Sequence, residues 1–270
     1  MASPELSVQL YTLRATLESD LEGTLDRLAG LGLRNVEGFN FVGRGPELRA
    51  AFDARGMRAA SGHAHFLSDV LHLGEVVIEV PEFEQVLDDA EALGMTYLIE
   101  PMVTPDRWTT PDDVARTAER LNAAAERAAE RGIRVGYHNH THEFHHSFDG
   151  VTAYEAFVGQ LRDDVVIELD AFWAQTGGQD VPALITRLGD RVKAMHVKDG
   201  IIKEDPFRAG RFFNADLDQR PAGEGEIQID AALAAATALE LAVIEFDRYD
   251  GDVFEGVEGT VRFLAERGIR

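Results

Sequence analysis

Residues 111–140, PDDVARTAERLNAAAERAAERGIRVGYHNH, decide how the chain is expected to fold. Up to Arg131, apolar residues recur three and four positions apart, which predicts an amphipathic helix, and Gly132 is a typical helix stop. Residues 133–140 then form a short run of β-type residues that ends in polar side chains. This stretch therefore predicts one helix followed by one strand.

The same rhythm recurs along the whole chain. Further β-type runs cover residues 6–12, 34–39, 57–66, 96–101, 165–172, 192–199 and 241–247. Helical patterns lie between them, for example at 20–32, 81–94 and 257–268. Eight strand-helix units in about 250 residues predict an α/β fold, a (β/α)8 TIM barrel that forms a single domain over residues 1–270. An open doubly wound sheet is the alternative, but no strand is followed by a glycine-rich dinucleotide or phosphate fingerprint.

The composition excludes several classes of partner. With 48 acidic and 26 basic residues, the net charge of -22 repels phosphate backbones and anionic membrane surfaces, so neither nucleic acid nor a membrane is expected. The absence of cysteine excludes disulfides and thiolate metal sites. Without a signal-like segment or a long apolar run, the expected location is the cytoplasm. Whether the chain forms a homo-oligomer stays open.

Polar residues, nearly all of them ionisable, gather where the predicted strands end. In a parallel barrel, these ends face the active-site mouth. Burying one such group without a partner costs several kcal/mol, so the whole set indicates a shared polar purpose. In chain order the candidates are Gln9, Glu37, His63, His65, Glu100, His138, His140, Asp170, His196, Lys198 and Glu245.

Three of these residues end successive strands and suit a metal ion. Asp170, His196 and Glu245 combine carboxylates with imidazole, a donor set for Mn²⁺, Mg²⁺, Co²⁺ or Zn²⁺. His138 ends the neighbouring strand. Taken singly, an acid at a strand end more often caps a helix, but four residues together predict one divalent ion.

The segment 137–146, YHNHTHEFHH, holds five of the nine histidines. His138 and His140 are two positions apart, so both are expected to point to the mouth. The other three, His142, His145 and His146, follow the strand and are expected to be solvated. The direction of Glu143, three residues beyond the strand, stays open.

Several further residues can be interpreted in two ways, as functional or as structural. Trp108, Phe172 and Trp173 are either apolar platforms for a sugar ring or core residues. Lys198 either contacts a substrate oxygen or pairs with a neighbouring acid. The segments 66–80 and 199–226 are expected to be irregular active-site loops, and Glu224 and Glu226 in the second either close over the mouth or stay in solvent.

These residues resemble the xylose isomerase-like barrel superfamily, the sugar phosphate isomerase/epimerase group. The resemblance covers nearly the whole chain and rests on SVQLYTLR (7–14), GYHNHTHEF (136–144), ELDAFWAQTGG (168–178), MHVKDG (195–200), AGEGEI (222–227) and VIEFDRYDG (243–251). It implies one divalent ion, with Mn²⁺ as the first choice, held by Glu, Asp, His and Glu on strands five to eight.

The last three of these ligands match Asp170, His196 and Glu245, but strand five departs from the pattern. His138 stands where the family has its Glu, and the nearest acid is Glu143. We expect Glu143 to bend back as the ligand, with His138 and His140 at the substrate. The alternative is that His138 binds the metal itself.

The resemblance implies an isomerase or epimerase of a small sugar or polyol. Catalysis would use Glu245, His138, His140 and Lys198 to remove a proton beside a carbonyl, giving an enediolate, with a near-neutral histidine as the assisting acid. The substrate-binding set would be Gln9, Glu37, His63, His65, Glu100, Trp108, Phe172 and Trp173. An uncharged substrate is expected, because Lys198, Lys203 and Arg248 lie among many acids where barrels bind phosphate.

Other functions stay open. A lyase that dehydrates a keto-inositol, like an inosose dehydratase, or eliminates from a 3-keto sugar would share the first proton removal. Nucleic-acid repair shares the fold but is opposed by the net charge. A non-catalytic binding module, or the partner subunit of an oxidoreductase, would lack a stoichiometric metal.

Overall fold

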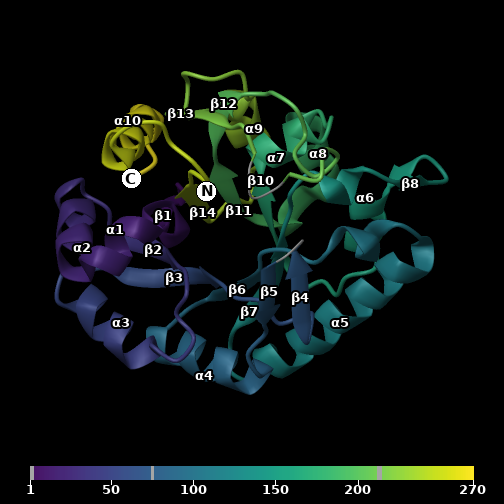
Figure 1. Ribbon diagram of the computed structural model, residues 1–270, viewed down its shortest axis with the longest axis horizontal. Coiled ribbons are helices and arrows are strands. Elements are labelled where there is room, and N and C mark those ends of the chain that lie inside the picture. The colour runs from purple at the N-terminus through teal and green to yellow at the C-terminus, as the bar shows by residue number, and fades with distance from the viewer. Residues whose placement is uncertain (1–2, 74–75, 212–214) are drawn as a thin grey trace.

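The computed structural model describes residues 3–73, 76–211 and 215–270, and it contains a closed barrel of parallel strands enclosed by helices (Figure 1). Around the barrel the strand order is β1-β14-β11-β10-β7-β6-β3-β2. The predicted α/β TIM barrel is confirmed, and each of the eight predicted segments supplies one barrel strand. These strands are β1 (Glu5–Gln9), β2 (Asn35–Gly38), β3 (Arg58–His63), β6 (Tyr97–Glu100), β7 (Arg134–His138), β10 (Val166–Asp170), β11 (Val192–Val197) and β14 (Leu241–Ile244).

The helices pack around the outside of the barrel, as Figure 1 shows. Predicted helices at 20–32, 81–94, 111–132 and 257–268 correspond to α2, α4, α5 and α10. α10 lies beside α2, where the Arg27 guanidinium stacks 3.6 Å from the Phe254 ring centroid. Among the described residues, no helix is long and apolar enough to cross a bilayer. The α-helices are α1 (Arg14–Ser19), α2 (Leu21–Gly30), α3 (Gly45–Asp53), α4 (Phe83–Leu93), α5 (Pro111–Ala129), α6 (Ala153–Val158), α7 (Ala171–Thr176), α8 (Val181–Leu188), α9 (Ile229–Ala235) and α10 (Val253–Glu266).

Apolar side chains form two layers, one between strands and helices and one inside the barrel. The inner layer is closely filled: a Cβ atom on Gly136 would lie 2.6 Å from both Ile99 Cδ1 and Val166 Cγ2. Because side chains alternate along a strand, the residues two and four positions beyond the inner layer also point inward, toward the mouth. The inner layer consists of Ala60, Tyr97, Ile99, Val166, Ala194, Leu241 and Val243.

The two long segments expected to be irregular contain short strands instead. Residues 66–80 include β4 (Val70–Leu73) and β5 (Val76–Glu79), which pair antiparallel. Residues 199–226 include β12 (Asp199–Ile201), paired with β13 (Asp218–Arg220). The prediction was wrong in this respect, because strands this short carry too little periodicity to be recognised, while their backbone groups still need hydrogen-bond partners.

The remaining short elements lie in the connections. A third antiparallel pair, β8 (Ser147–Phe148) with β9 (Val151–Thr152), follows the histidine-rich segment among the described residues. Single turns of 3-10 helix are η1 (Leu10–Leu13), η2 (Pro105–Trp108), η3 (His142–Phe144) and η4 (Gly189–Arg191). η1 occupies the end of the predicted first strand, so that strand stops at Gln9.

Candidate metal centre and active site

A buried polar cluster lies at the carboxyl ends of β7, β10, β11 and β14. The parallel register places Glu168 opposite His138 and Asp170 opposite His196. Glu168, Asp170 and His196 are each fully buried. Burial of this many ionisable groups is tolerated only where they compensate one another or bind a ligand.

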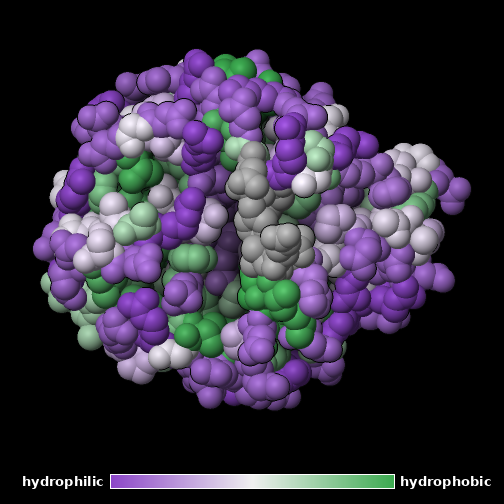
Figure 2. Space-filling model, in the orientation of Figure 1, coloured by the Kyte–Doolittle hydropathy of each residue, from purple (hydrophilic) through white to green (hydrophobic). Residues whose placement is uncertain are grey.

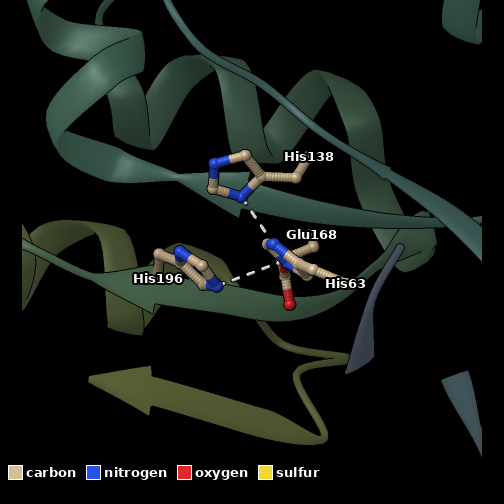
Figure 3. Close-up of side chains that lie close together, drawn as sticks. All are labelled: His63, His138, Glu168 and His196. Atoms are coloured by element: carbon tan, nitrogen blue, oxygen red, sulfur yellow. Dashed lines mark hydrogen bonds and ion pairs between the residues drawn. The ribbon is translucent and has the colours of Figure 1, made fainter. Parts of the chain in front are cut away.

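One half of the cluster is centred on Glu168 (Figure 3). Its Oε2 atom lies 2.5 Å from His63 Nε2, 3.2 Å from His196 Nε2 and 3.3 Å from His138 Nδ1. The four side chains come from β3, β7, β10 and β11 and point toward one another. Three imidazoles and one carboxylate are a donor set that a transition metal could use.

The other half lies nearer the mouth and shares two of these histidines. His196 Nδ1 lies 2.6 Å from Glu245 Oε2 and 3.8 Å from Asp170 Oδ2, and His138 Nε2 lies 3.9 Å from Asp170 Oδ2. One ligand atom from each of these four residues falls within 4.8 Å of the others. The structure thus brings Asp170, His196 and Glu245 together as the sequence predicted, and His138 with them.

Asp170 has a second task that fixes its orientation. Its Oδ1 atom accepts a hydrogen bond of 2.8 Å from the backbone amide of Trp173 and so caps α7. The side chain of Asn139 holds the backbone of the same residue, because its Oδ1 accepts from the Asp170 amide at 3.0 Å. Oδ2 is left facing the cluster. Helix capping and metal binding are therefore compatible uses of one carboxylate.

Lys198 places a positive charge inside the cluster. Its Nζ atom lies 2.8 Å from Asp170 Oδ2, 2.6 Å from Glu245 Oε2 and 2.8 Å from Asp247 Oδ2. Burial lowers the pKa of this amine, but the three carboxylates more than compensate and hold the pKa well above its ordinary value. Lys198 therefore pairs with neighbouring acids, one of the two readings of its sequence position.

Glu37 and His63 form a second charged layer beneath the mouth. Glu37 Oε1 accepts hydrogen bonds from Gln9 Nε2 at 2.7 Å and from His196 Nε2 at 2.8 Å, and Oε2 accepts one of 2.6 Å from Ser61. Burial opposes ionisation of Glu37, yet the charge of His63 and hydrogen bonds from both histidines hold its pKa well below the usual range. Burial likewise opposes protonation of His63, but Glu37 and Glu168 raise its pKa to about 10.

His138 differs in charge from His63 and His196. Burial, reinforced by the nearby His196, His140 and His63, lowers the pKa of His138 well below its ordinary value. The ring is therefore neutral near pH 7 and can bind a metal or accept a proton.

Glu143 lies outside both groups of potential ligands found among the described residues. Its Oε1 accepts a hydrogen bond of 2.9 Å from the Tyr137 hydroxyl, and its Oε2 accepts one of 3.0 Å from the backbone amide of His140. Burial raises the pKa of this carboxyl to about 8. The structure thus does not follow the expectation that Glu143 bends back toward the metal, because these two donors hold its carboxylate within its own turn.

His65 and Glu100 hold the loop after β3. His65 Nδ1 lies 2.8 Å from Glu100 Oε1, and Glu100 Oε2 accepts from the backbone amides of Phe66 and Leu67 at 2.7 and 2.8 Å. Glu100 is therefore a loop anchor, whereas His65 also lines a cavity at the mouth.

The predicted aromatic platforms are buried. Trp108 packs edge-on against Tyr137 and Phe157, with ring centroids 5.5 and 5.2 Å apart, in the core outside the barrel. Phe172 belongs to the same core, as does Trp173, whose ring centroid lies 5.4 Å from Lys198 Nζ. The core reading of these three residues therefore fits the structure better than the platform reading.

The histidines beyond β7 are mostly structural. His142 is buried, and its Nε2 donates a hydrogen bond of 2.9 Å to the carbonyl of Val103. The expectation of solvation was wrong for His142, because the ring of Phe207, in the segment after β12, packs 4.3 Å from it. His145 Nε2 lies 2.7 Å from Asp205 Oδ2, and His146 is exposed as expected.

Two further expectations concerned the segment after β13. Glu224 is exposed, and Glu226 accepts a hydrogen bond of 2.6 Å from the backbone amide of Ile202. Asp199 holds this segment through the backbone amides of Gly223, Gly225 and Ile227 at 2.8 to 3.1 Å. These contacts place the segment beside β12.

The sequence reasoning missed Glu168. This residue lies two positions before Asp170 on the same strand, so the alternation that paired His138 with His140 also places Glu168 and Asp170 on one face. The signal was present but was read as part of an apolar run.

The cluster opens into a cavity of about 460 Å³. His63, His138, His140 and Glu245 line it, so a bound molecule can reach both the candidate ligands and Lys198's partner Glu245. Figure 2 shows that this face of the molecule is hollowed near its centre. Gln9 and Glu37 lie below the cavity lining and act through hydrogen bonds to one another and to His196.

Comparisons with known proteins agree with this architecture. The inosose isomerase of Bacillus subtilis (strain 168) is 24% identical over 159 residues, an alignment that covers 58% of this chain and 54% of that protein. The chain thus spans about half the length of the curated relative that it matches.

Solved structures share the fold over nearly the full chain. A sugar phosphate isomerase/epimerase from Parabacteroides distasonis ATCC 8503 superposes with a TM-score of 0.73 and 22% identity, covering 98% of this chain and 94% of that one. The IOLI protein, crystallised with a zinc atom, superposes with a TM-score of 0.72 and 18% identity, and the superposition covers 97% of each chain. The D-allulose 3-epimerase from Methylomonas sp. superposes with a TM-score of 0.66 and 13% identity, covering 99% of this chain and 100% of that one.

A family model provides the assignment. The model described as xylose isomerase-like TIM barrel matches residues 25–264, which include all barrel strands except β1. The chain therefore belongs to the xylose isomerase-like TIM barrel family.

Proposed function

We propose that the chain is a divalent-metal-dependent isomerase or epimerase that acts on a sugar or polyol through an enediolate. The observation that carries this proposal is the convergence of two imidazoles and two carboxylates, from four adjacent strands, beside a cavity at the barrel mouth. The isomerases and epimerases among the compared proteins point to the same class of reaction.

His138, Asp170, His196 and Glu245 would hold the ion. They fit a metal, because the four donors lie close together and Asp170 Oδ2, which Lys198 Nζ contacts at 2.8 Å, also faces both histidines. Two imidazoles with two carboxylates suit Mn²⁺, our first choice, as well as Co²⁺ and Zn²⁺, better than Mg²⁺, which prefers oxygen ligands. When bound, such an ion polarises a carbonyl and makes the neighbouring carbon acidic.

The protein's own residues supply the proton transfers. Glu245 is ionised, because Lys198 and His196 overcome the effect of burial and lower its pKa, so its carboxylate can accept a proton from a carbon atom. Lys198 is not among the described residues that line the cavity, and its ammonium, 2.6 Å from Glu245 Oε2, acts by keeping that carboxylate ionised. His140 lines the cavity, where it can bind a hydroxyl.

A lyase is the second candidate, because Glu245 can serve both of the proton transfers that it needs. After a base removes the proton beside the carbonyl, a hydroxide can leave the next carbon if an acid protonates it to water. Glu245 lines the cavity, so its carboxylate can take the carbon proton and then pass that proton to the leaving oxygen.

The test combines metal analysis with NMR in deuterated water. Elemental analysis of protein loaded with Mn²⁺ should give one ion per chain. Incubation with a panel of ketoses and inososes should then introduce deuterium beside the carbonyl without loss of water. A chelated sample serves as the control and should be inactive. An unsaturated product would identify the lyase instead, and absence of both bound metal and exchange would refute the enzyme proposal.

A further inference from the structure

The cavity at the barrel mouth has two unlike sides. His63, His138, His140, Glu245 and Asp247 form a polar side that adjoins the candidate metal ligands. On this side a sugar or polyol would find partners for its hydroxyl groups. This arrangement belongs to the function proposed above.

The opposite side is apolar and comes from the loops after β1, β2 and β6 and from β5. Tyr11 and Phe39 meet edge to face with ring centroids 5.1 Å apart, and Val42, Ile78 and Met102 continue the wall. Phe41, Ala64, Pro81 and Pro101 complete it. Tyr11, Phe39, Val42 and Ile78 are only half-buried, so their apolar surface remains available to a ligand. In Figure 2 hydrophobic residues gather along the lower rim of the hollow.

The charges around the cavity select against an anionic ligand. Glu79, Glu245 and Asp247 are carboxylates, and the described lining residues include no lysine or arginine. A phosphate group on the apolar side would therefore meet carboxylates without a lysine or arginine to pair with it.

The size and composition of the wall also select against a second sugar. A volume of about 460 Å³ is typical of sites that hold ligands of several rings or chains. On the apolar side, the described residues with polar side-chain groups beyond the Tyr11 hydroxyl are Asn40, Glu79 and His65, and His65 is paired with Glu100. The many hydroxyls of a second sugar would lose water there without gaining partners, whereas an apolar group would gain from burial.

We propose that the substrate is an uncharged sugar derivative that carries an apolar substituent, such as a glycoside with an aromatic aglycone. The sugar end lies against the polar side, which rests on the proposed function, and the substituent lies against Tyr11, Phe39, Val42, Ile78 and Met102. The apolar wall thus determines substrate specificity while the polar cluster performs the reaction.

The test measures binding of unreactive analogues to the Mn²⁺-loaded protein by isothermal titration calorimetry. Methyl and phenyl β-glycosides of D-glucose, D-galactose and D-xylose lack the carbonyl and cannot turn over. The phenyl compounds should bind at least about tenfold more tightly than the methyl compounds of the same sugar. Cellobiose and glucose 6-phosphate should bind more weakly than phenyl glucoside.

Two neighbouring residues of β5 provide a matched pair of variants. Ile78 lines the cavity, and Val77 next to it is 57% exposed on the other face of the hairpin. Ile78→Ser should weaken phenyl glycoside binding several-fold and leave methyl glycoside binding unchanged. Val77→Ser should change neither, which controls for general damage to the hairpin.

Equal affinities for phenyl and methyl glycosides, no detectable binding of either, or tighter binding of cellobiose would overturn the inference. An effect of Ile78→Ser on both ligand types alike would do the same. Because the assay needs no turnover, a phenyl preference in a protein that shows no isotope exchange would refute the proposed reaction and keep the substrate class. Isotope exchange without a preference for phenyl glycosides would support the proposed reaction and refute the proposed substrate class.

Discussion

Two regions rich in ionisable residues behave differently. The segment 137–146 concentrates five histidines, yet His142 and His145 serve to hold loops through Val103 and Asp205. In contrast, His63 and Glu168 are separated by 105 positions and meet at 2.5 Å. In a parallel barrel, the layer that a residue occupies on its strand decides which residues it contacts. The number of histidines in a short stretch of sequence does not decide this.

The largest effect that this contrast predicts is that of Asp170→Asn. The variant keeps the helix-capping oxygen for Trp173 but loses the ligand charge, so Mn²⁺ affinity and turnover should both fall by about a hundredfold or more. Calorimetric titration with Mn²⁺ and initial rates measure the two losses.

Glu143→Gln is the matched control from the histidine-rich segment. Its Mn²⁺ affinity should stay within about threefold of the wild type, since Glu143 lies outside both donor groups of the described residues. If Glu143→Gln lost the metal as Asp170→Asn does, the strand-five ligand would be Glu143, and the contrast between the two regions would collapse.

Lys198→Met should destabilise the metal-free protein by about 3–5 kcal/mol. It leaves Asp170 and Glu245 buried without their counter-ion. Urea denaturation in a chelator measures the loss, and Mn²⁺ should recover part of it, because the ion replaces the missing charge. Lys193→Met, in the strand β11 that ends just before Lys198, is the control, with an expected change below about 1 kcal/mol, since its ion pair with Glu240 is partly exposed. Wild-type stability of Lys198→Met would contradict the assigned pairing.

The pH dependence of the free energy of unfolding should reveal that the carboxyl group of Glu143 is buried away from the charged cluster. Burial raises its folded-state pKa to about 8, above the ordinary value of 4.5, so the folded protein binds a proton that the unfolded chain releases. The contribution to stability is complete below pH 4.5 and is lost as the pH rises toward 8, at no more than about 1.4 kcal/mol for each pH unit.

Glu143→Gln should remove this slope. In a chelator, the free energy of unfolding of the variant relative to wild type should rise between pH 5 and pH 8 and stay level above it. Parallel stability curves for the two proteins would show that the carboxyl ionises freely in the folded state.

The smallest effect is expected for His145→Ala. Loss of the contact with Asp205 should cost about 1 kcal/mol of unfolding free energy and leave Mn²⁺ affinity unchanged. His138→Ala, seven positions earlier, should reduce Mn²⁺ affinity at least tenfold. If His145→Ala and His138→Ala reduced Mn²⁺ affinity equally, the distinction between a structural His145 and a metal-binding His138 would be wrong.

The fold could be predicted from the sequence because it depends on local signals that repeat. Each barrel strand is a short β-type run followed by a helical pattern and, often, a glycine stop, as at Gly132. The inward direction of Asp170, His196 and Glu245 follows from alternation along their strands. The same rule would have placed Glu168, had the acid in VIELD been counted with the strand ends.

Other features depend on contacts that no local pattern encodes. Glu143 is held by the Tyr137 hydroxyl, and Lys198 is enclosed by acids at the end of β10 and directly after β14. The burial of His142 requires Phe207, which arrives from a segment about sixty residues later. The apolar side of the cavity likewise joins loops from four separate connections, which only the closed barrel brings together.

The most direct test of the central claim is the location of manganese in a crystal of the protein, determined from anomalous scattering. The proposed centre predicts one peak per chain, coordinated by His138, Asp170, His196 and Glu245. A peak coordinated by Glu143, or no peak in crystals saturated with Mn²⁺, would contradict it.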